Sequence, residues 1–256
     1  MMRNFTDLTG RKAIVTGGTR GLGHGMAEGL MEAGAEVVIV GSSDKVYTVA
    51  EEFTKNGYQC HGAVVNLGDP QDRARGFEEA VAKLGDHLDI LVNAAGVQRR
   101  HPSEEFPVED YNYVIEVNQN AVFDWCQRAA KKFIAQDGKG KIINIASMLS
   151  FFGGYTVPAY AASKGAVAQL TKAFCNEWAS KKINVNALAP GYMDTEMNTA
   201  LTDPSNPRCA EITGRIPAHV WGTPEDMKGP CVFLASDASD YLNGAIIPVD
   251  GGYLVK

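Results

Sequence analysis

The sequence contains no run of 18 apolar residues and no excess of positive charge. A membrane-spanning helix needs about 20 consecutive apolar residues, so the absence of such a run argues against one. The formal net charge of −6 argues against binding to a nucleic-acid backbone, which requires clustered Lys and Arg. Residues 1–10 lack the apolar stretch of a secretory signal. We therefore expect a cytoplasmic protein whose partners include neither nucleic acid nor a membrane.

Cysteines are few, odd in number and widely scattered. None forms a C-x-x-C pair, so neither a disulfide framework nor a zinc site is indicated. We expect free thiols, mostly buried, and no bound metal. The five are Cys60, Cys126, Cys175, Cys209 and Cys231.

Short β-branched segments alternate with helix-like segments along all 256 residues. Several are apolar at successive positions, as expected of strands covered by helices on both faces. This pattern predicts a single α/β domain with a doubly wound parallel sheet. The least regular stretch, residues 192–223, contains Pro204, Pro207 and Pro217, and we interpret it as a substrate loop or lid. The predicted strands are Lys12–Thr16, Glu36–Val40, Gln59–Val65, Leu88–Asn93, Lys141–Ala146, Ile183–Ala189 and Ala245–Val249.

A glycine-rich turn follows the first predicted strand directly and precedes a helical segment. Glycines there let backbone N–H groups approach a pyrophosphate, whose charge the helix N-terminus favours. The spacing is G-x-x-x-G-x-G, which differs from the common G-x-G-x-x-G fingerprint. The turn therefore indicates a dinucleotide site formed by Gly17, Thr19, Arg20, Gly21, Leu22 and Gly23.

The end of the second predicted strand bears on the choice between NAD and NADP. An acidic residue there binds the ribose 2′-OH of NAD, whereas an arginine accommodates the 2′-phosphate of NADP. No carboxylate stands at this strand end, and Arg20, Ser42 and Ser43 are candidate ligands of the 2′-phosphate. Together these features weakly favour NADP over NAD. Alternatively, Ser42, Ser43 and Asp44 cap the next helix. The sequence leaves the choice open.

Three residues suggest acid/base chemistry on an alcohol. Tyr160 and Lys164 are four residues apart in an Ala-rich helical segment, so they project from one face. A neighbouring ammonium stabilises a phenolate, and we expect Lys164 to lower the pKa of Tyr160. Ser147 follows a predicted strand, where ligands gather in an open parallel sheet; the alternative is a helix cap.

Taken together, these pieces resemble the short-chain dehydrogenase/reductase family over essentially the whole chain. The turn at 16–23, Asn93-Ala-Ala-Gly96, Ser147, Tyr160-x-x-x-Lys164 and Pro190-Gly191 occur in the family's order and spacing. The resemblance implies a Rossmann fold, direct hydride transfer with NAD or NADP, and a homotetramer. It implies a catalytic tetrad of Asn118, Ser147, Tyr160 and Lys164, in which Tyr160 is the acid/base, Ser147 positions the reacting oxygen and Asn118 supports a proton relay.

The same resemblance implies further cofactor contacts. It places Asn66 and Leu67 near the adenine, although Asn66 stands where the family usually has Asp. The remaining contacts that it implies, around the ribose and the nicotinamide, are Asn93, Ala94, Gly96, Pro190, Gly191, Met193 and Thr195.

More local stretches resemble family members that act on sugar acids of the 2-deoxy-D-gluconate and 2-dehydro-3-deoxy-D-gluconate type. Arg99 and Arg100 then become candidates for binding a carboxylate, with Gln98 or His101 for hydroxyls; the alternative is a solvated basic loop. A 3-oxoacyl thioester or another small ketone is the alternative substrate, and a cofactor-binding redox sensor is the non-enzymatic alternative. Candidate apolar pocket residues are Met148, Tyr155, Tyr192 and Trp221.

Overall fold

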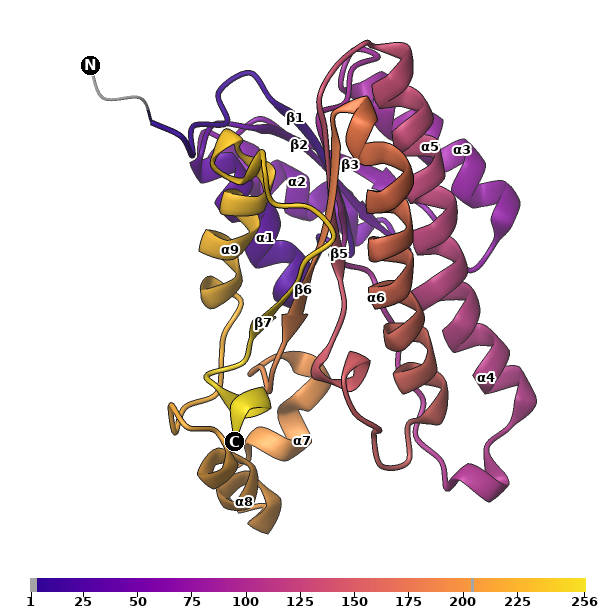
Figure 1. The fold of residues 1–256 in the computed structure, drawn as a ribbon, viewed down its shortest axis with the longest axis vertical. Helices are drawn as coiled ribbons and strands as arrows, with labels where there is room; N and C mark the ends of the chain where they lie inside the picture. The colour runs from indigo at the N-terminus through magenta and orange to yellow at the C-terminus, as the bar shows by residue number, and fades with distance from the viewer. Residues whose placement is uncertain (1–3, 204) are drawn as a thin grey trace.

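The fold is a seven-stranded parallel sheet between two layers of helices (Figure 1), seen in a computed structural model that describes residues 4–203 and 205–256. Pro204, which belongs to the predicted lid, lies outside the described residues. The strand order is β3-β2-β1-β4-β5-β6-β7, with every neighbouring pair parallel. The strands are β1 (Lys12–Thr16), β2 (Glu36–Gly41), β3 (Cys60–Val64), β4 (Ile90–Asn93), β5 (Gly140–Ile145), β6 (Ile183–Pro190) and β7 (Ile246–Val249).

The predicted doubly wound α/β fold is confirmed, and each predicted strand is present within two residues of its expected bounds. After β3 the chain crosses back over β2 and β1 to form β4, so the winding direction reverses between β1 and β4. In open parallel sheets, ligands bind at this switch point, outside the carboxyl ends of the strands.

Helices cover both faces of the sheet (Figure 1). Helices α1, α2 and α9 lie on one face, and α3, α5 and α6 on the other. The helices are α1 (Gly21–Glu32), α2 (Lys45–Lys55), α3 (Pro70–Lys83), α4 (Val108–Ile115), α5 (Ala121–Ala135), α6 (Pro158–Trp178), α7 (Thr199–Thr202), α8 (Pro207–Arg215) and α9 (Lys228–Ala235). A π-helical turn, η2 (Glu116–Asn120), joins α4 to α5, and short 3-10 turns include η3 (Met148–Ser150) and η5 (Glu196–Asn198).

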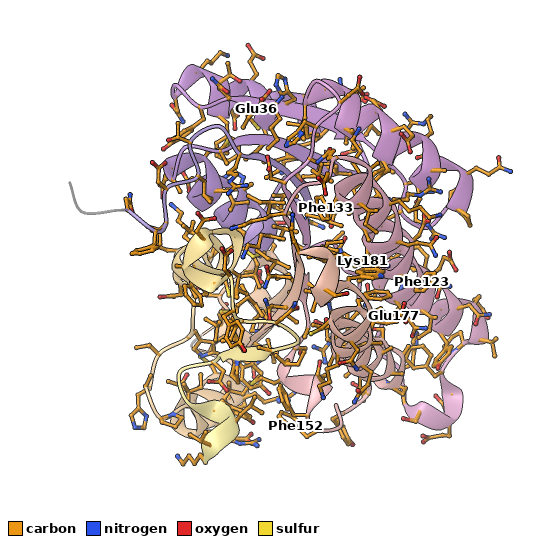
Figure 2. The ribbon with its side chains drawn as sticks, turned by 45° about the horizontal axis from the view of Figure 1, so that its top comes forward. Glu36, Phe123, Phe133, Phe152, Glu177 and Lys181 are labelled. Carbon is orange, nitrogen blue, oxygen red and sulfur yellow. The ribbon has the colours of Figure 1, made fainter. Side chains whose placement is uncertain are left out.

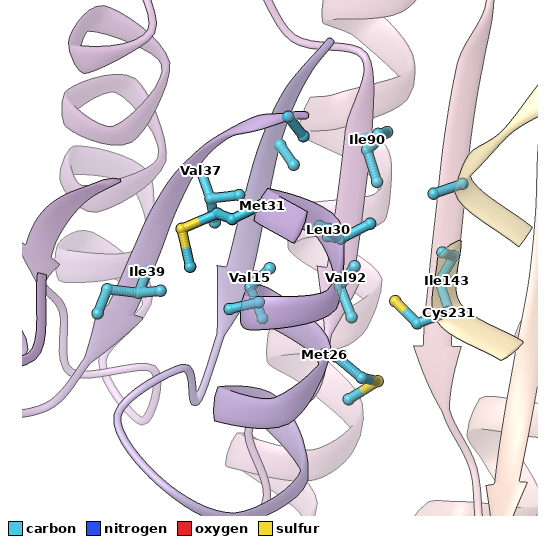
Figure 3. Packing of buried hydrophobic residues seen from close by; sticks show 14 of the residues in the cluster. Val15, Met26, Leu30, Met31, Val37, Ile39, Ile90, Val92, Ile143 and Cys231 are labelled. Carbon is cyan, nitrogen blue, oxygen red and sulfur yellow. The ribbon is translucent and has the colours of Figure 1, made fainter. Parts of the chain in front are cut away.

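Each face of the sheet has its own hydrophobic core, which explains the consecutive apolar residues in the strands. Successive side chains of a strand point to opposite faces. Val15 therefore packs with Met26 and Leu30 of α1 (Figure 3), whereas Ile14 belongs to the cluster on the opposite face. Both residues are fully buried, so neither strand face is exposed to water.

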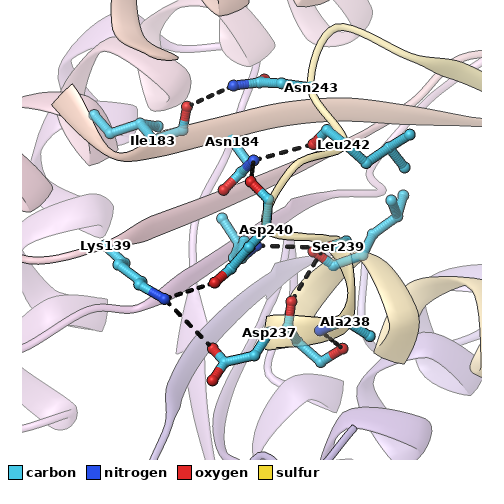
Figure 4. Close-up of polar contacts among 12 residues, drawn as sticks. Lys139, Ile183, Asn184, Asp237, Ala238, Ser239, Asp240, Leu242 and Asn243 are labelled. Carbon is cyan, nitrogen blue, oxygen red and sulfur yellow. Dashed lines mark hydrogen bonds and ion pairs between the residues drawn. The ribbon is translucent and has the colours of Figure 1, made fainter. Parts of the chain in front are cut away.

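A polar network closes the amino-terminal end of the sheet, far from the carboxyl ends of the strands (Figure 4). Lys141 of β5 is 5% exposed, and its Nζ lies 2.9 Å from Asp240 Oδ1. Burial lowers the pKa of Lys141, and Asp240 opposes this change. The Asn184 side chain of β6 donates to the carbonyl oxygens of Asp240 and Leu242, both at 3.0 Å. These bonds tie the loop before β7 to β5 and β6.

The five cysteines are free, as predicted: Cys60, Cys126 and Cys231 are buried, and Cys175 and Cys209 are partly buried. Within the described part of the chain, no helix has the length and apolar character needed to cross a membrane.

Residues 192–223 lie at the carboxyl end of the sheet and include η5, α7 and α8 (Figure 1). Two backbone bonds fix the ends of this stretch: Asp194 N donates to Gly222 O at 2.7 Å, and Gly222 N donates to Tyr192 O at 3.0 Å. The segment is thus a loop with a closed base that carries short helices.

Candidate active site

A cleft of about 700 Å³ opens at the carboxyl ends of the strands. Its walls come from the loops after β1, β2, β3, β4, β5 and β6 and from α6, as expected at the switch point of this sheet. The cleft brings together most of the predicted cofactor residues: Gly17, Thr19, Arg20, Gly21, Leu22, Gly23, Ser42, Asn66, Leu67, Ala94, Gly96, Tyr160, Lys164, Pro190, Gly191, Met193 and Thr195.

The glycine-rich turn has the close backbone approaches that a diphosphate site requires. A Cβ on Gly23 would lie 2.3 Å from Gly17 O, so only glycine fits there. Gly17 (φ +68°) and Gly21 (φ +55°) both adopt the left-handed conformation, which favours glycine. Helix α1 begins at Gly21, so its N-terminal N–H groups and its dipole face an anion bound in the turn. The turn therefore fits the diphosphate of a dinucleotide.

Thr16, the last residue of β1, positions the neighbouring loop. Its Oγ1 accepts hydrogen bonds from the backbone N of Ala94 and of Ala95, both at 3.0 Å. This holds the loop after β4 against the glycine-rich turn, and both loops line the cleft.

Asn93, which we expect beside the ribose, does not itself line the cleft. Asn93 is 3% exposed, and its amide donates to Asn144 Oδ1 at 2.9 Å and to Cys126 Sγ at 3.3 Å. The strand register turns its side chain towards α5 and β5, where it joins a buried network. Its neighbours Ala94, Ala95 and Gly96 reach the cleft instead.

At the end of β2, Ser42 lines the cleft whereas Ser43 does not. Ser43 is exposed, and its carbonyl accepts from Val46 N at 3.1 Å, so its backbone serves the start of α2. The alternative interpretation, side-chain capping of this helix, is wrong, because Asp44 stands at the cap position without a side-chain capping bond.

Arg20 pairs with Glu196 across the mouth of the cleft, with Nη1 2.8 Å from Oε2. Both side chains are about two-thirds exposed, and such an exposed pair contributes about 1 kcal/mol or less. A phosphate dianion bound nearby can therefore compete with Glu196 for Arg20.

Tyr160, Lys164 and Ser147 meet at the inner end of the cleft. Tyr160 and Lys164 lie one turn apart on α6, and Lys164 Nζ is 5.6 Å from the centroid of the Tyr160 ring. Lys164 is 3% exposed, and Nζ donates to Ile145 O at 2.5 Å. Ser147 caps η3 by accepting from Leu149 N at 3.1 Å, and it also hydrogen bonds to Tyr160. The cap interpretation of this serine is thus confirmed, and the same residue also lines the cleft.

Burial governs the ionisation of this pair and corrects one expectation. The pKa of Tyr160 is raised because desolvation outweighs the opposing effects of the Ser147 hydrogen bond and the Arg100 charge. The net change is therefore opposite in direction to the lowering that we expected from Lys164. Burial instead lowers the pKa of Lys164 itself to about 8.

Asn118 lies in the π-helical turn η2 and is fully buried. Its side chain exchanges two hydrogen bonds with the backbone of Val97, at 2.8 Å and 2.9 Å, and donates to Ser163 Oγ at 3.3 Å. Asn118 therefore fixes the loop after β4 against α6. Single π-turns inside helices often occur at functional sites.

The two arginines after β4 differ, although Gln98, Arg99 and Arg100 all line the cleft. Arg99 Nε is 3.3 Å from Asp110 Oδ1, and its guanidinium lies 5.0 Å from the centroid of the Tyr113 ring. His101 Nε2 is 2.7 Å from the other carboxylate oxygen of Asp110, so this histidine, a candidate for binding hydroxyls, is engaged outside the cleft. Arg100 is exposed and has neither a hydrogen bond nor an ion pair to the described residues.

The predicted apolar pocket residues do not line the cleft. Tyr155 is 87% exposed, whereas Met148 is buried beside Tyr192 and Trp221 in a small separate core. The Tyr192 and Trp221 rings are 5.3 Å apart, and Trp221 Nε1 donates to Thr213 Oγ1 of α8 at 2.9 Å. These aromatic residues anchor the 192–223 segment. Phe152 reaches the same end of the molecule, near the C-terminal segment (Figure 2).

Some residues that line the cleft were not predicted. Those at strand ends follow from the topology, whereas Tyr113 comes from α4 and carries no local signal in the sequence. The unpredicted residues are Val40, Gly41, Val65, Gly68, Ala95, Val97, Tyr113, Val117, Ile145, Ala146, Glu196 and Asn198.

Comparison with known proteins agrees with this geometry. A family model described as short chain dehydrogenase matches residues 11–206. The chain belongs to this family. Relatives called 2-dehydro-3-deoxy-D-gluconate 5-dehydrogenase, from Escherichia coli and Dickeya dadantii, are 48% and 47% identical, with 100% of both chains covered in each case. A structure of a gluconate 5-dehydrogenase from Burkholderia cenocepacia, in complex with NADP and tartrate, is 40% identical and has a TM-score of 0.94, covering 99% of this chain and 98% of that one.

As a member of the short-chain dehydrogenase family, the protein is an NAD(P)-dependent oxidoreductase that acts on CH–OH groups. The Rossmann fold and the NAD(P) cofactor that the resemblance implied are both confirmed.

Proposed function

We propose that the protein interconverts a secondary alcohol and a ketone on a sugar acid of the deoxy-aldonate type, with Tyr160 as the acid/base. The observation that carries the proposal is the set of residues that line one cleft. The glycine-rich turn lines the same cleft as Tyr160, Ser147 and the unpaired Arg100. The names of the relatives, 2-dehydro-3-deoxy-D-gluconate 5-dehydrogenase and gluconate 5-dehydrogenase, support the same substrate class.

Different residues of the chain have different roles in this reaction. A bound nicotinamide supplies the hydride acceptor or donor. Ser147 holds the reacting oxygen of the substrate by a hydrogen bond, next to the phenol of Tyr160. In the reductive direction the Tyr160 hydroxyl donates its proton to the carbonyl oxygen and becomes a phenolate, and in the oxidative direction this phenolate accepts the alcohol proton. Burial raises the pKa of Tyr160 and so favours the protonated phenol that the reductive direction needs.

Lys164 and Asn118 support the reaction without holding the reacting oxygen of the substrate. The Lys164 ammonium, 5.6 Å from the Tyr160 ring centroid, supplies positive charge beside a developing phenolate. Asn118 holds the loop that carries Gly96 and Val97 against α6. In the role implied by the family, Asn118 also supports proton transfer towards Lys164.

We assign NADP as the preferred dinucleotide. The cleft end near β2 contains Gly41 and Ser42 and no carboxylate, and Arg20 is held only by an exposed ion pair with Glu196. A 2′-phosphate can therefore replace Glu196 as the partner of Arg20. The NADP complex of the Burkholderia cenocepacia relative supports this choice. Arg20→Ala should weaken NADP binding at least tenfold and NAD binding less than threefold, measured by titration of each dinucleotide.

Residues 192–223 would act as the lid over the substrate. Thr195, Glu196 and Asn198 line the cleft mouth, while the aromatic cluster at Trp221 fixes the far end of the segment. Closure over the reacting groups would exclude water.

A cytoplasmic homotetramer is the assembly we propose from the family resemblance. Helices α5 and α6 present suitable surfaces for subunit contact: Phe123 is 44% exposed, near Glu177 of α6 (Figure 2), and a Cβ on Gly165 would meet no atom within 4 Å. Small residues on a helix allow close packing across a two-fold axis. Light scattering that gives a monomer mass would contradict this assembly.

The test of function follows the absorbance of reduced nicotinamide. NAD and NADP, in both redox states, are each combined with 2-dehydro-3-deoxy-D-gluconate, 2-deoxy-D-gluconate, gluconate and a 3-oxoacyl thioester. Turnover confined to the sugar acids is expected. Turnover of the thioester alone would keep the mechanism and overturn the substrate class, and binding of dinucleotide without turnover of any compound would favour a redox sensor.

A further inference from the structure

The segment after β4 carries two adjacent arginines that have different surroundings. Arg99 is bound to Asp110 and stacks near Tyr113, whereas Arg100 has no polar partner among the described residues. Both residues carry the same charge, so the difference arises from the groups packed against them.

Asp110, in the first turn of α4, accounts for this difference. One carboxylate oxygen lies 3.3 Å from Arg99 Nε, and the other lies 2.7 Å from His101 Nε2. The carboxylate therefore holds the two residues that flank Arg100. The Asp110 side chain is 28% exposed, less than that of either partner.

The spacing of these contacts determines where Arg100 points. In an extended segment, residues i and i+2 lie on one side of the chain and residue i+1 lies on the other. Arg99 and His101 both reach the same carboxylate, so they share a side, and Arg100 is turned away from α4. Arg100 lines the same cleft as Tyr160 and Ser147, and its positive charge acts on Tyr160.

A second contact fixes the segment from the opposite direction. His101 N donates to Thr156 O at 3.1 Å, and Thr156 lies two residues before α6, which carries Tyr160. The His101 ring also packs edge-on against Phe106, with centroids 5.0 Å apart. The backbone around Arg100 is thus held between α4 and the start of α6.

We propose that Asp110 is a specificity-determining positioning residue, which binds Arg99 and His101 so that Arg100 alone presents its guanidinium to the carboxylate of the substrate. This inference rests on the proposed sugar-acid function and deepens it. A guanidinium without a competing partner is free to bind a carboxylate through two parallel N–H donors. Asp110 touches neither substrate nor cofactor in this arrangement and acts through Arg100.

The test measures KM and kcat with 2-dehydro-3-deoxy-D-gluconate and with its uncharged primary amide. Arg100→Met should raise KM for the acid at least tenfold, and Arg99→Met less than threefold. Asp110→Ala should raise KM for the acid about tenfold, change kcat less than twofold and leave KM for the amide unchanged. Asp110→Glu should restore part of the loss. The matched control is Glu109→Ala, which removes an exposed carboxylate from the same helical turn and should change neither constant.

A double-mutant cycle separates positioning from a general structural effect. If Asp110 acts through Arg100, Asp110→Ala should raise KM less than twofold further when Arg100→Met is already present. Additive effects, or equal effects on acid and amide, would overturn the inference. If Asp110→Ala does not fold, Asp110→Asn takes its place in the cycle, with a smaller effect in the same direction.

The wild-type comparison distinguishes the two proposals. Equal kcat/KM for the acid and the amide would overturn the sugar-acid function together with the inference. A clear preference for the acid, combined with an additive cycle, would overturn the inference alone.

Discussion

Lys164 is a buried cation, and replacing it should make the protein more stable while it abolishes activity. Burial lowers the pKa of Lys164 from 10.5 to about 8. Since one pKa unit corresponds to about 1.4 kcal/mol, keeping this group charged in the folded protein costs about 3 kcal/mol at neutral pH. Methionine has a similar unbranched shape and no charge, so Lys164→Met removes this cost.

The substitution also removes one hydrogen bond, the donation from Lys164 Nζ to Ile145 O. Losing it costs about 1–2 kcal/mol, so the net gain in the free energy of unfolding at pH 7 is about 1–2 kcal/mol. The gain depends on pH. Between pH 8 and pH 10.5 the folded wild type binds fewer protons than the unfolded chain, so its stability rises with pH; the gain of the variant closes and then reverses, because only the lost hydrogen bond remains.

The assay is urea unfolding followed by tryptophan fluorescence at pH 7 and pH 10.5, at one protein concentration. Lys131→Met, which removes an exposed lysine from α5, serves as the control and should change stability by less than about 0.5 kcal/mol. A variant less stable than wild type at pH 7, or a difference that does not shrink with pH, would refute the reasoning.

Two further predictions concern the cofactor turn and the base of the sheet. Gly23→Ala should raise the dinucleotide Kd at least tenfold in calorimetric titration, because the added Cβ would lie 2.3 Å from Gly17 O. The control is Gly229→Ala, whose added Cβ has no atom within 4 Å and which should leave the Kd unchanged. Asp240→Ala should lower the free energy of unfolding by about 1–3 kcal/mol in urea, since Lys141 stays buried without its carboxylate and the exposure of Asp240 limits the loss. An unchanged midpoint would contradict that role of Asp240.

The sequence was sufficient to predict the sheet and the dinucleotide turn, because both depend on local patterns. Consecutive apolar residues such as Ile14 and Val15 indicate a strand with two covered faces, and Gly17 and Gly23 follow that strand directly. The direction of a side chain at a strand end depends on the pairing of that strand with its neighbours, and not on the local sequence alone. Asn93 stands one residue before the loop that lines the cleft, and the register of β4 against β5 directs its amide to Asn144 instead.

Contacts between distant segments could not be predicted from the sequence. Arg99 and Arg100 are equivalent by sequence, and only the packing of α4 beside them brings Asp110 within reach of Arg99. In the same way, the sequence shows that Tyr192 and Trp221 are aromatic, but only the folded chain shows that their rings pack against each other. The net pKa change of Tyr160 follows from its burial, which is also a property of the folded chain.

The most direct test of the central claim is the turnover of Tyr160→Phe with saturating dinucleotide and sugar acid. The substitution removes only the hydroxyl that exchanges the proton, so kcat should fall by about 10²–10⁴ while the dinucleotide Kd changes less than twofold. A kcat within a few-fold of wild type would show that Tyr160 is not the acid/base.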